Sequence, residues 1–128
     1  MTKLTTTRSA LGKANKKKGY QAEKKTADEI VKVLGGFSKP TPRSGGIWMS
    51  GDVFVKGSEL EDWVIEVKSG KQIPKKIIDW ANKVRSESQG KKFAIVLRGD
   101  YERPLIGLDL DQFLSLIYEL QGYKKEYL

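Results

Sequence analysis

Cysteine and histidine are both absent from the 128 residues, and their absence excludes several classes of chemistry. Without cysteine the chain can form no disulfide bond and offers no thiol nucleophile, and without either residue it cannot build a Cys/His zinc site. No imidazole is present to act as a metal ligand or general base. If the chain is an enzyme, its proton and metal chemistry must come from Asp, Glu, Lys, Tyr or a hydroxyl group. A hard, oxygen-liganded cation such as Mg²⁺ suits carboxylate ligands.

Long apolar segments are also missing, and acidic residues are outnumbered. No apolar run approaches the roughly 20 residues that cross a bilayer, and the N-terminus lacks the apolar stretch of a signal peptide. Asp and Glu number 16 against 24 Lys and Arg, which gives a formal net charge of +8 and a sequence pI near 9.6. We therefore expect a polyanion as partner, no contact with a membrane, and a cytoplasmic protein.

The spacing of apolar residues predicts one α/β domain with a mixed central β-sheet flanked by helices. Helices are expected at about residues 20–34, at about 74–88 and from 111 onward, where apolar residues recur at helical spacing. Strands are expected at residues 37–43, 52–56, 62–68, 93–97 and 105–108. The second and third of these strands are expected to form a hairpin.

The N-terminal residues differ in character from the rest of the chain. Residues 1–22 contain lysine and arginine but no acidic residue before Glu23, and they show little apolar periodicity. This composition predicts a flexible basic arm over residues 1–18 and a folded domain over residues 19–128. Two interpretations of the arm stay open, namely a solubilising tail or a segment whose cations, including Lys16, Lys17 and Lys18, follow DNA phosphates.

Glu23 is the first candidate site residue. It lies one turn before Ala27 and therefore on the inward, apolar stripe of the first expected helix. An inward carboxylate near a helix start can interact favourably with the helix dipole, or it can reach into a functional site. The sequence leaves both interpretations open.

Three further charged residues are expected to meet on adjacent strands. Side chains alternate between the two faces of a strand, so Glu66 and Lys68 share a face. Antiparallel pairing across the hairpin can place Asp52 beside Glu66. Two carboxylates this close repel unless a cation lies between them, which predicts a divalent-metal site. Lys68 can then orient an attacking water or offset charge on phosphate oxygens, as hydrolysis of a phosphodiester without histidine requires.

The alternative interpretation of this cluster is a solvated hairpin face, on which charged pairs are ordinary. The neighbours of Glu66 count against it, because Trp63, Val64, Ile65 and Val67 are all apolar. Such a strand is expected to be covered on both faces, where a buried charge needs a partner.

Several short segments together resemble a known family. RSGG at residues 43–46, GD at 51–52 and VIEVKSG at 64–70 look like the motif of the PD-(D/E)XK nucleases. The segment KKGYQAEKK at residues 17–25 and the amphipathic helix that follows narrow the resemblance to the archaeal and viral Holliday junction resolvases. The similarity covers roughly residues 17–96.

The resemblance implies a restriction-endonuclease-like fold and a homodimeric, Mg²⁺-dependent endonuclease that cuts four-way DNA junctions with paired nicks. Mn²⁺ is expected to substitute for Mg²⁺, and the location would be the host cytoplasm if the chain is viral. The matching catalytic residues are Glu23, Asp52, Glu66 and Lys68. The implied metal ligands are Asp52, Glu66, the backbone carbonyl of Val67 and, directly or through water, Glu23. The implied DNA-binding residues are Arg43, Ser44, Lys16, Lys17, Lys18 and Lys24.

Two features of the sequence depart from the family pattern, and they bear on the geometry of the DNA substrate more than on the cleavage chemistry. Lys24 stands where the family often has arginine, and the basic segment before Lys17 is longer than usual. A homodimer also has a physical argument, because a symmetric junction needs two matched cuts and this chain has one expected site.

Two alternatives to a junction resolvase remain. One is another nuclease of the same superfamily that acts on duplex, nicked or flapped DNA, which substrate competition would distinguish. The other is a non-catalytic, basic nucleic-acid-binding module, which metal dependence would distinguish. No residue pattern for reading bases is evident, so any specificity is expected to be for shape and backbone.

Overall fold

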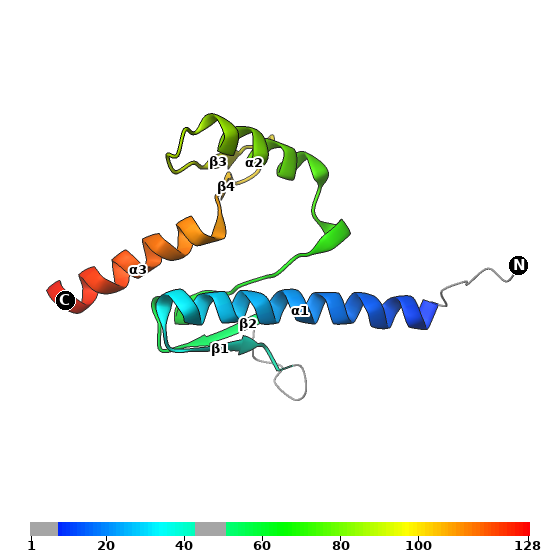
Figure 1. Ribbon diagram of the computed structural model, residues 1–128, viewed down its shortest axis with the longest axis horizontal. Helices are drawn as coiled ribbons and strands as arrows, with labels where there is room; N and C mark the ends of the chain where they lie inside the picture. Colours follow the sequence, from blue (N-terminus) through cyan, green and yellow to red (C-terminus); the bar gives the residue numbers. More distant parts are fainter. Residues whose placement is uncertain (1–7, 43–50) are drawn as a thin grey trace, which may run out of the picture. The chain divides into compact units, whose positions relative to one another are not determined.

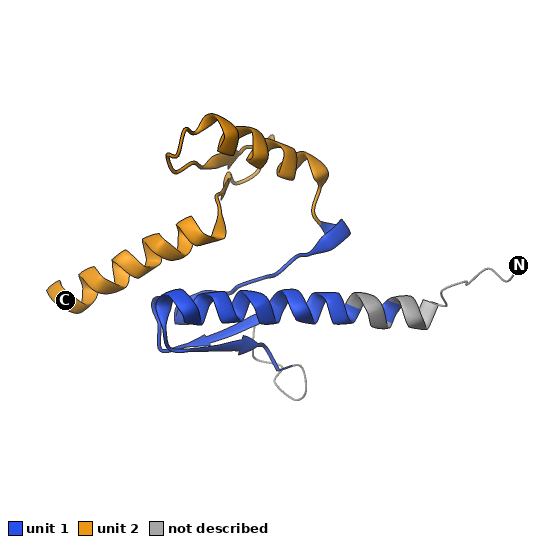
Figure 2. Cartoon of the chain, viewed as in Figure 1, with its two compact units in different colours: residues 1–72 blue, residues 73–128 orange. Residues whose placement is uncertain are grey.

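The structure is a computed structural model, and it describes residues 8–42 and 51–128. The chain divides into two compact units, unit 1 (Met1–Gln72) and unit 2 (Ile73–Leu128), coloured separately in Figure 2.

Unit 1 contains a helix that is longer than the sequence predicted. Helix α1 spans Arg8–Leu34, so its end agrees with the prediction but its start does not. Residues 8–18, predicted to belong to a flexible arm, lie within this helix, and residues 1–7 lie outside the described part of the chain. The segment is rich in lysine and alanine, which have high helix propensity, so it extends the helix without an apolar stripe of its own.

Two glycines end α1 and turn the chain into the first strand. Gly35 and Gly36 both have positive φ angles, of 77° and 72°, and the Gly35 N–H donates to the Val31 carbonyl at 2.9 Å. A Cβ on Gly36 would lie 2.5 Å from the carbonyl oxygen of Lys56, whereas a Cβ on Gly35 would meet open space. Gly36 is therefore required for both its conformation and its close contact with the neighbouring strand.

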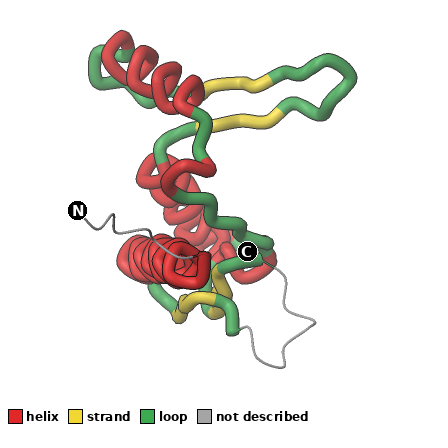
Figure 3. Tube along the Cα trace, turned by 90° about the vertical axis from the view of Figure 1, so that its right-hand side faces the viewer, coloured by secondary structure: helices red, strands yellow, loops and turns green. Residues whose placement is uncertain are grey.

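A two-stranded hairpin packs against α1. Strand β1 (Phe37–Pro40) pairs antiparallel with β2 (Val53–Lys56), and Pro40 lies opposite Val53 in the register. The two views in Figures 1 and 3 agree that α1 lies along one face of this hairpin. The buried apolar residues of unit 1 are Ala27, Ile30 and Leu34 of α1, Val53 and Val55 of β2, and Leu60.

The third expected strand, residues 62–68, is mostly absent. After β2 the chain forms a 3₁₀ turn, η1 (Glu59–Asp62), and it then makes a single antiparallel bridge, between Ile65 and Val53. The turn buries Leu60, which is 1% exposed, and the Gly57 N–H donates to the Glu61 carboxylate at 3.1 Å. These local interactions replace the tight hairpin that the sequence predicted. A second short 3₁₀ turn, η2 (Gly70–Gln72), ends the unit.

Unit 2 follows the predicted order of elements. Helix α2 spans Lys75–Glu87, strands β3 (Ile95–Leu97) and β4 (Leu105–Gly107) pair antiparallel, and α3 spans Leu110–Tyr127. Asp109 occupies the N-cap position of α3, but its side chain makes no capping hydrogen bond. Its carboxylate instead accepts two hydrogen bonds from the Arg85 guanidinium, at 2.6 and 3.2 Å, which links α2 to the start of α3.

The predicted α/β class is confirmed. The described residues contain three α-helices and two antiparallel sheets of two strands each. Joining of these strands in one mixed central sheet stays a prediction. In the described ranges, no helix has the length and apolar character that crossing a membrane requires.

Candidate functional site

Unit 1 carries the four residues that were predicted to be catalytic, and all four are described. Glu23 lies on α1, Asp52 directly precedes β2, and Glu66 and Lys68 follow the bridge at Ile65. Of the predicted DNA-binding residues, Arg43 and Ser44 lie outside the described part of the chain.

Hydrogen bonds fasten Asp52 to the segment that carries Glu66. The Asp52 N–H donates to the Ile65 carbonyl at 2.7 Å, and its carboxylate Oδ2 accepts from the Val67 N–H at 2.7 Å. On its other side, the Asp52 carbonyl accepts from the Thr41 N–H at 3.0 Å. Because Ile65 and Val67 are the chain neighbours of Glu66, Asp52 lies beside Glu66, as the sequence predicted.

Gly51 has a positioning role that the sequence analysis missed. It has a positive φ of 83°, and a Cβ there would lie 2.9 Å from the Ile65 carbonyl oxygen and 3.0 Å from the Ile65 nitrogen. Any other residue would push this backbone away from Ile65, and with it the carboxylate of Asp52. The available signal was the glycine directly before the aspartate in the GD pair.

Glu66 and Lys68 share a face, as expected from strand alternation, but that face is exposed. Their side chains are 57% and 62% exposed, and the Lys68 Nζ lies 3.9 Å from the Glu66 Oε2. The expectation that Glu66 is covered on both sides was wrong, since Trp63 and Val64 are themselves 50% and 64% exposed. In the described chain this segment pairs only through the bridge at Ile65, so no sheet surrounds it. An ion pair this exposed adds little to stability.

Glu23 is buried, and its position in α1 excludes one of its two interpretations. It is 8% exposed and belongs to the same helix face as Ala27, Ile30 and Leu34, which confirms its predicted inward placement. Because α1 begins at Arg8, Glu23 lies several turns from the helix start. The field of a helix dipole is confined to the first and last turns, so it cannot account for a carboxylate at this depth.

The carboxylates do not form a group of three. Across residues 8–42 and 51–128, no set of three or more Asp and Glu residues is arranged to hold a metal ion. Glu23 is therefore not brought into one ligand set with Asp52 and Glu66. The pair of Asp52 and Glu66 still offers the hard oxygen donors that Mg²⁺ prefers, and Mg²⁺ commonly takes only one or two protein carboxylates, with water and phosphate at its other positions.

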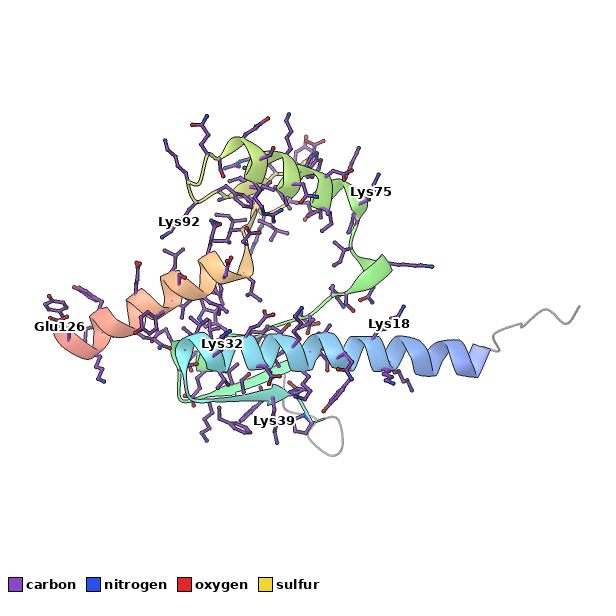
Figure 4. The ribbon with its side chains drawn as sticks, viewed as in Figure 1. Lys18, Lys32, Lys39, Lys75, Lys92 and Glu126 are labelled. Atoms are coloured by element: carbon purple, nitrogen blue, oxygen red, sulfur yellow. The ribbon has the colours of Figure 1, made fainter. Side chains whose placement is uncertain are left out.

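The predicted phosphate-binding lysines are exposed along α1. Lys16, Lys17 and Lys18 are all accessible to solvent, and Figure 4 marks Lys18 on the part of the helix before the hairpin. Lys24 is also exposed, and its Nζ lies 3.3 Å from Asp28 Oδ2 in an i,i+4 ion pair. Lys16 precedes Glu23 by seven residues, so the two lie on the same helix face, two turns apart.

Comparisons with protein-family models, with curated proteins and with solved structures found no match to this chain.

Proposed function

We propose that this chain is a Mg²⁺-dependent endonuclease that acts on branched DNA, and that a homodimer of it cuts four-way junctions with paired nicks. The observation that carries the proposal is the position of Asp52, whose backbone and side chain bond to the residues on both sides of Glu66. Asp52 and Glu66 thereby lie on adjacent segments of unit 1, and the Lys68 ammonium lies 3.9 Å from the Glu66 carboxylate.

Each of these residues has a role in the proposed hydrolysis. Asp52 and Glu66 would hold Mg²⁺, together with the Val67 carbonyl, and Glu23 would act through a water molecule. The bound ion would neutralise charge on the phosphate and lower the pKa of a bound water. The Lys68 ammonium, already close to Glu66, would orient the attacking water and offset negative charge on the phosphate oxygens. The hydrogen bond from the Val67 N–H keeps the Asp52 carboxylate in place for this role.

DNA as the substrate is supported by charge. The net charge of +8 favours a polyanion, and exposed lysines extend along α1 from Lys16 to Lys25. Deleting residues 1–15 should make log affinity fall more gently with log salt, by up to about 0.9 for each phosphate contact removed. Cleavage of bound DNA should survive the deletion, since no proposed catalytic residue lies there. An unchanged affinity and salt slope would mean that these residues are a solubilising tail.

The finer fold assignment belongs to the same proposal. The order of a helix, two strands, a bridged third segment, a helix, two strands and a helix is the order expected for a restriction-endonuclease-like domain. In that arrangement the strands of both units would join one mixed central sheet. An experimental structure of the homodimer in which the two hairpins stay in separate sheets would contradict this part of the proposal.

The proposed activity is tested on a synthetic four-way junction and on a linear duplex of the same sequence. Purified protein is incubated with each substrate in Mg²⁺ or in EDTA, and the products are resolved on a denaturing gel. We expect paired nicks in the junction, only with metal, and none with Glu66→Gln. Cleavage that persists in EDTA or in the Glu66→Gln variant would refute the assigned site. Preferential cleavage of duplex, nicked or flapped DNA would support the proposed hydrolysis but contradict the four-way junction as the substrate.

A second candidate function, binding of nucleic acid without catalysis, is favoured by one observation. Glu66 and Lys68 are exposed and lie 3.9 Å apart, as charged residues do on an ordinary solvated surface. In that case the protein still binds DNA in EDTA, and it cuts none of the substrates with or without Mg²⁺. The gel assay above separates the two functions.

A further inference from the structure

The face of the β1–β2 hairpin that points away from α1 carries alternating aromatic and basic side chains. In the register, Phe37 lies opposite Lys56 and Lys39 lies opposite Phe54. Ser38, Val53 and Val55 alternate with these four residues and are half-buried or buried, toward α1. Figure 4 shows Lys39 on the side of β1 away from that helix. We call Phe37, Lys39, Phe54 and Lys56 the outer hairpin face.

The two rings of this face are close together and remain accessible. The centroids of Phe37 and Phe54 are 6.3 Å apart, with the ring planes at 68°. The ammonium of Lys39 lies 5.8 Å from the centroid of Phe37. Phe37 is 52% exposed, Phe54 is half-buried, and both lysines are exposed. Burial of apolar area therefore accounts for part of the position of Phe54 but not for the exposed ring of Phe37.

A depression beside β2 and the η1 turn continues this face. Its lining includes Phe54, Lys56 and the half-exposed Trp63, a third aromatic ring. Glu61 and Asp62 also line it, and their negative charge disfavours a phosphate at this end. An aromatic surface that disfavours phosphate is suited to bind a nucleotide base. Lys39 and Lys56 are suited to bind the phosphates on either side of that base.

We propose that the outer hairpin face binds unpaired nucleotides of DNA, whose bases stack on Phe37 and Phe54 while their phosphates contact Lys39 and Lys56. Aromatic side chains interleaved with cations are the combination by which proteins hold single strands, because every base has a flat face for stacking. Paired bases in an intact duplex do not offer that face. This inference rests on the proposed function in one respect only, namely that the polymer is DNA. Such a face would allow the protein to recognise the place where a duplex opens.

The first test uses the unaltered chain. A 12-residue oligothymidylate carrying one 5-iododeoxyuridine is bound to the protein in EDTA, irradiated, and the crosslinked residues are located by mass spectrometry. We expect crosslinks to Phe37 or Phe54, since the photoreaction favours stacked aromatic rings. Crosslinks confined to other parts of the chain would overturn the proposal. Because EDTA prevents metal-dependent cleavage, this result does not depend on whether the protein is a nuclease.

The second test compares matched variants by fluorescence anisotropy. Phe37→Leu keeps apolar bulk and should weaken binding of the oligothymidylate roughly tenfold, as expected for the loss of one base–aromatic stack. Its affinity for blunt duplex DNA should be unchanged. Tyr127→Leu is the control, since Tyr127 is also an exposed aromatic residue, at 64%, and lies in α3. This control should not change oligothymidylate binding.

Several outcomes would reject the outer hairpin face as a binding site. One is an equal loss of affinity in Phe37→Leu and Tyr127→Leu, and another is no loss in Phe37→Leu. A change in sedimentation of Phe37→Leu with unchanged oligothymidylate affinity would show that the face contacts a second copy of this chain instead. If Phe37→Leu fails to fold, the crosslinks on the unaltered chain decide. If the protein cleaves the junction but gives no crosslinks to this face, only the binding proposal is refuted. If it gives the crosslinks but cleaves no junction, only the proposed nuclease activity is refuted.

Discussion

Replacing Asp52 separates its structural role from its proposed catalytic role. Its carboxylate accepts a hydrogen bond of 2.7 Å from the Val67 N–H. Asp52→Asn keeps an oxygen that can accept this bond but removes the charge, whereas Asp52→Ala removes the acceptor as well. The two variants should therefore differ in stability and agree in activity.

The expected magnitudes follow from this one contact. A hydrogen bond to a charged acceptor contributes about 1 kcal/mol more than a neutral one, so Asp52→Asn should lower the free energy of unfolding by about 1 kcal/mol or less. Asp52→Ala leaves the Val67 N–H without its acceptor and should lower it by about 1–3 kcal/mol. In a unit of this size each kcal/mol corresponds to a melting temperature lower by about 4–8 °C.

Activity should respond in a different way. In the proposed site Asp52 is a metal ligand, and loss of such a ligand removes several kcal/mol of transition-state stabilisation, so both variants should cleave at least about 100-fold more slowly. Junction binding should stay the same or become tighter, because a negative charge near the phosphates is gone. The measurements are thermal melting by circular dichroism, gel-based cleavage in Mg²⁺ and anisotropy for binding. Near-parental cleavage by Asp52→Asn would refute the assignment of Asp52, and equal melting temperatures for Asp52→Ala and the parent would refute the structural argument.

Three other predictions concern single residues. Glu23→Gln, at a buried position, should cost far more cleavage than melting temperature if this side chain serves the site, and the reverse result would make it a packing residue. Gly36→Ala should lower the melting temperature much more than Gly35→Ala, since both have positive φ but only Gly36 faces a carbonyl at 2.5 Å; similar losses would contradict this. The hydrogen bond from Arg85 lowers the pKa of Asp109, so the bond's stabilisation is present above the ordinary carboxyl pKa and is lost as pH falls through the lowered one. Melting followed from pH 7 to strongly acidic buffer, about pH 2, should show this acid-side loss in the parent and less of it in Asp109→Asn.

The sequence was most informative where local patterns decide the structure. The spacing of Ala27, Ile30 and Leu34 and the glycine pair after them predicted the buried face and the end of α1. Asp52 was predicted to lie beside Glu66 although the tight hairpin behind that prediction does not form. For Asp52 and Glu66 to lie side by side, the chain need only reverse direction between them. The hydrogen bond from the Val67 N–H to the Asp52 carboxylate then holds the two segments together.

The incorrect predictions depended on contacts that the sequence pattern does not record. The start of α1 was misplaced because an apolar stripe was required of a segment that is helical by propensity. The third strand was overestimated because alternation suggested extension over residues 62–68, whereas this segment pairs with β2 only through the bridge at Ile65. Glu66 was expected to be covered because its neighbours are apolar, but coverage depends on which other elements approach, and here Val64 is itself exposed.

The early start of α1 changes how its lysines would contact DNA under the proposed function. A disordered arm loses conformational freedom when it binds, by about 1–2 kcal/mol for each residue that becomes fixed. A helix has already lost that freedom when the protein folds. The 27 residues of α1 also give it a set length of about 40 Å, close to the 34–36 Å of one turn of B-DNA. Under the proposed function, phosphates contacted along α1 would therefore be separated by distances fixed by the protein. A duplex whose backbone is bent or interrupted within that length would present its phosphates differently from a straight one.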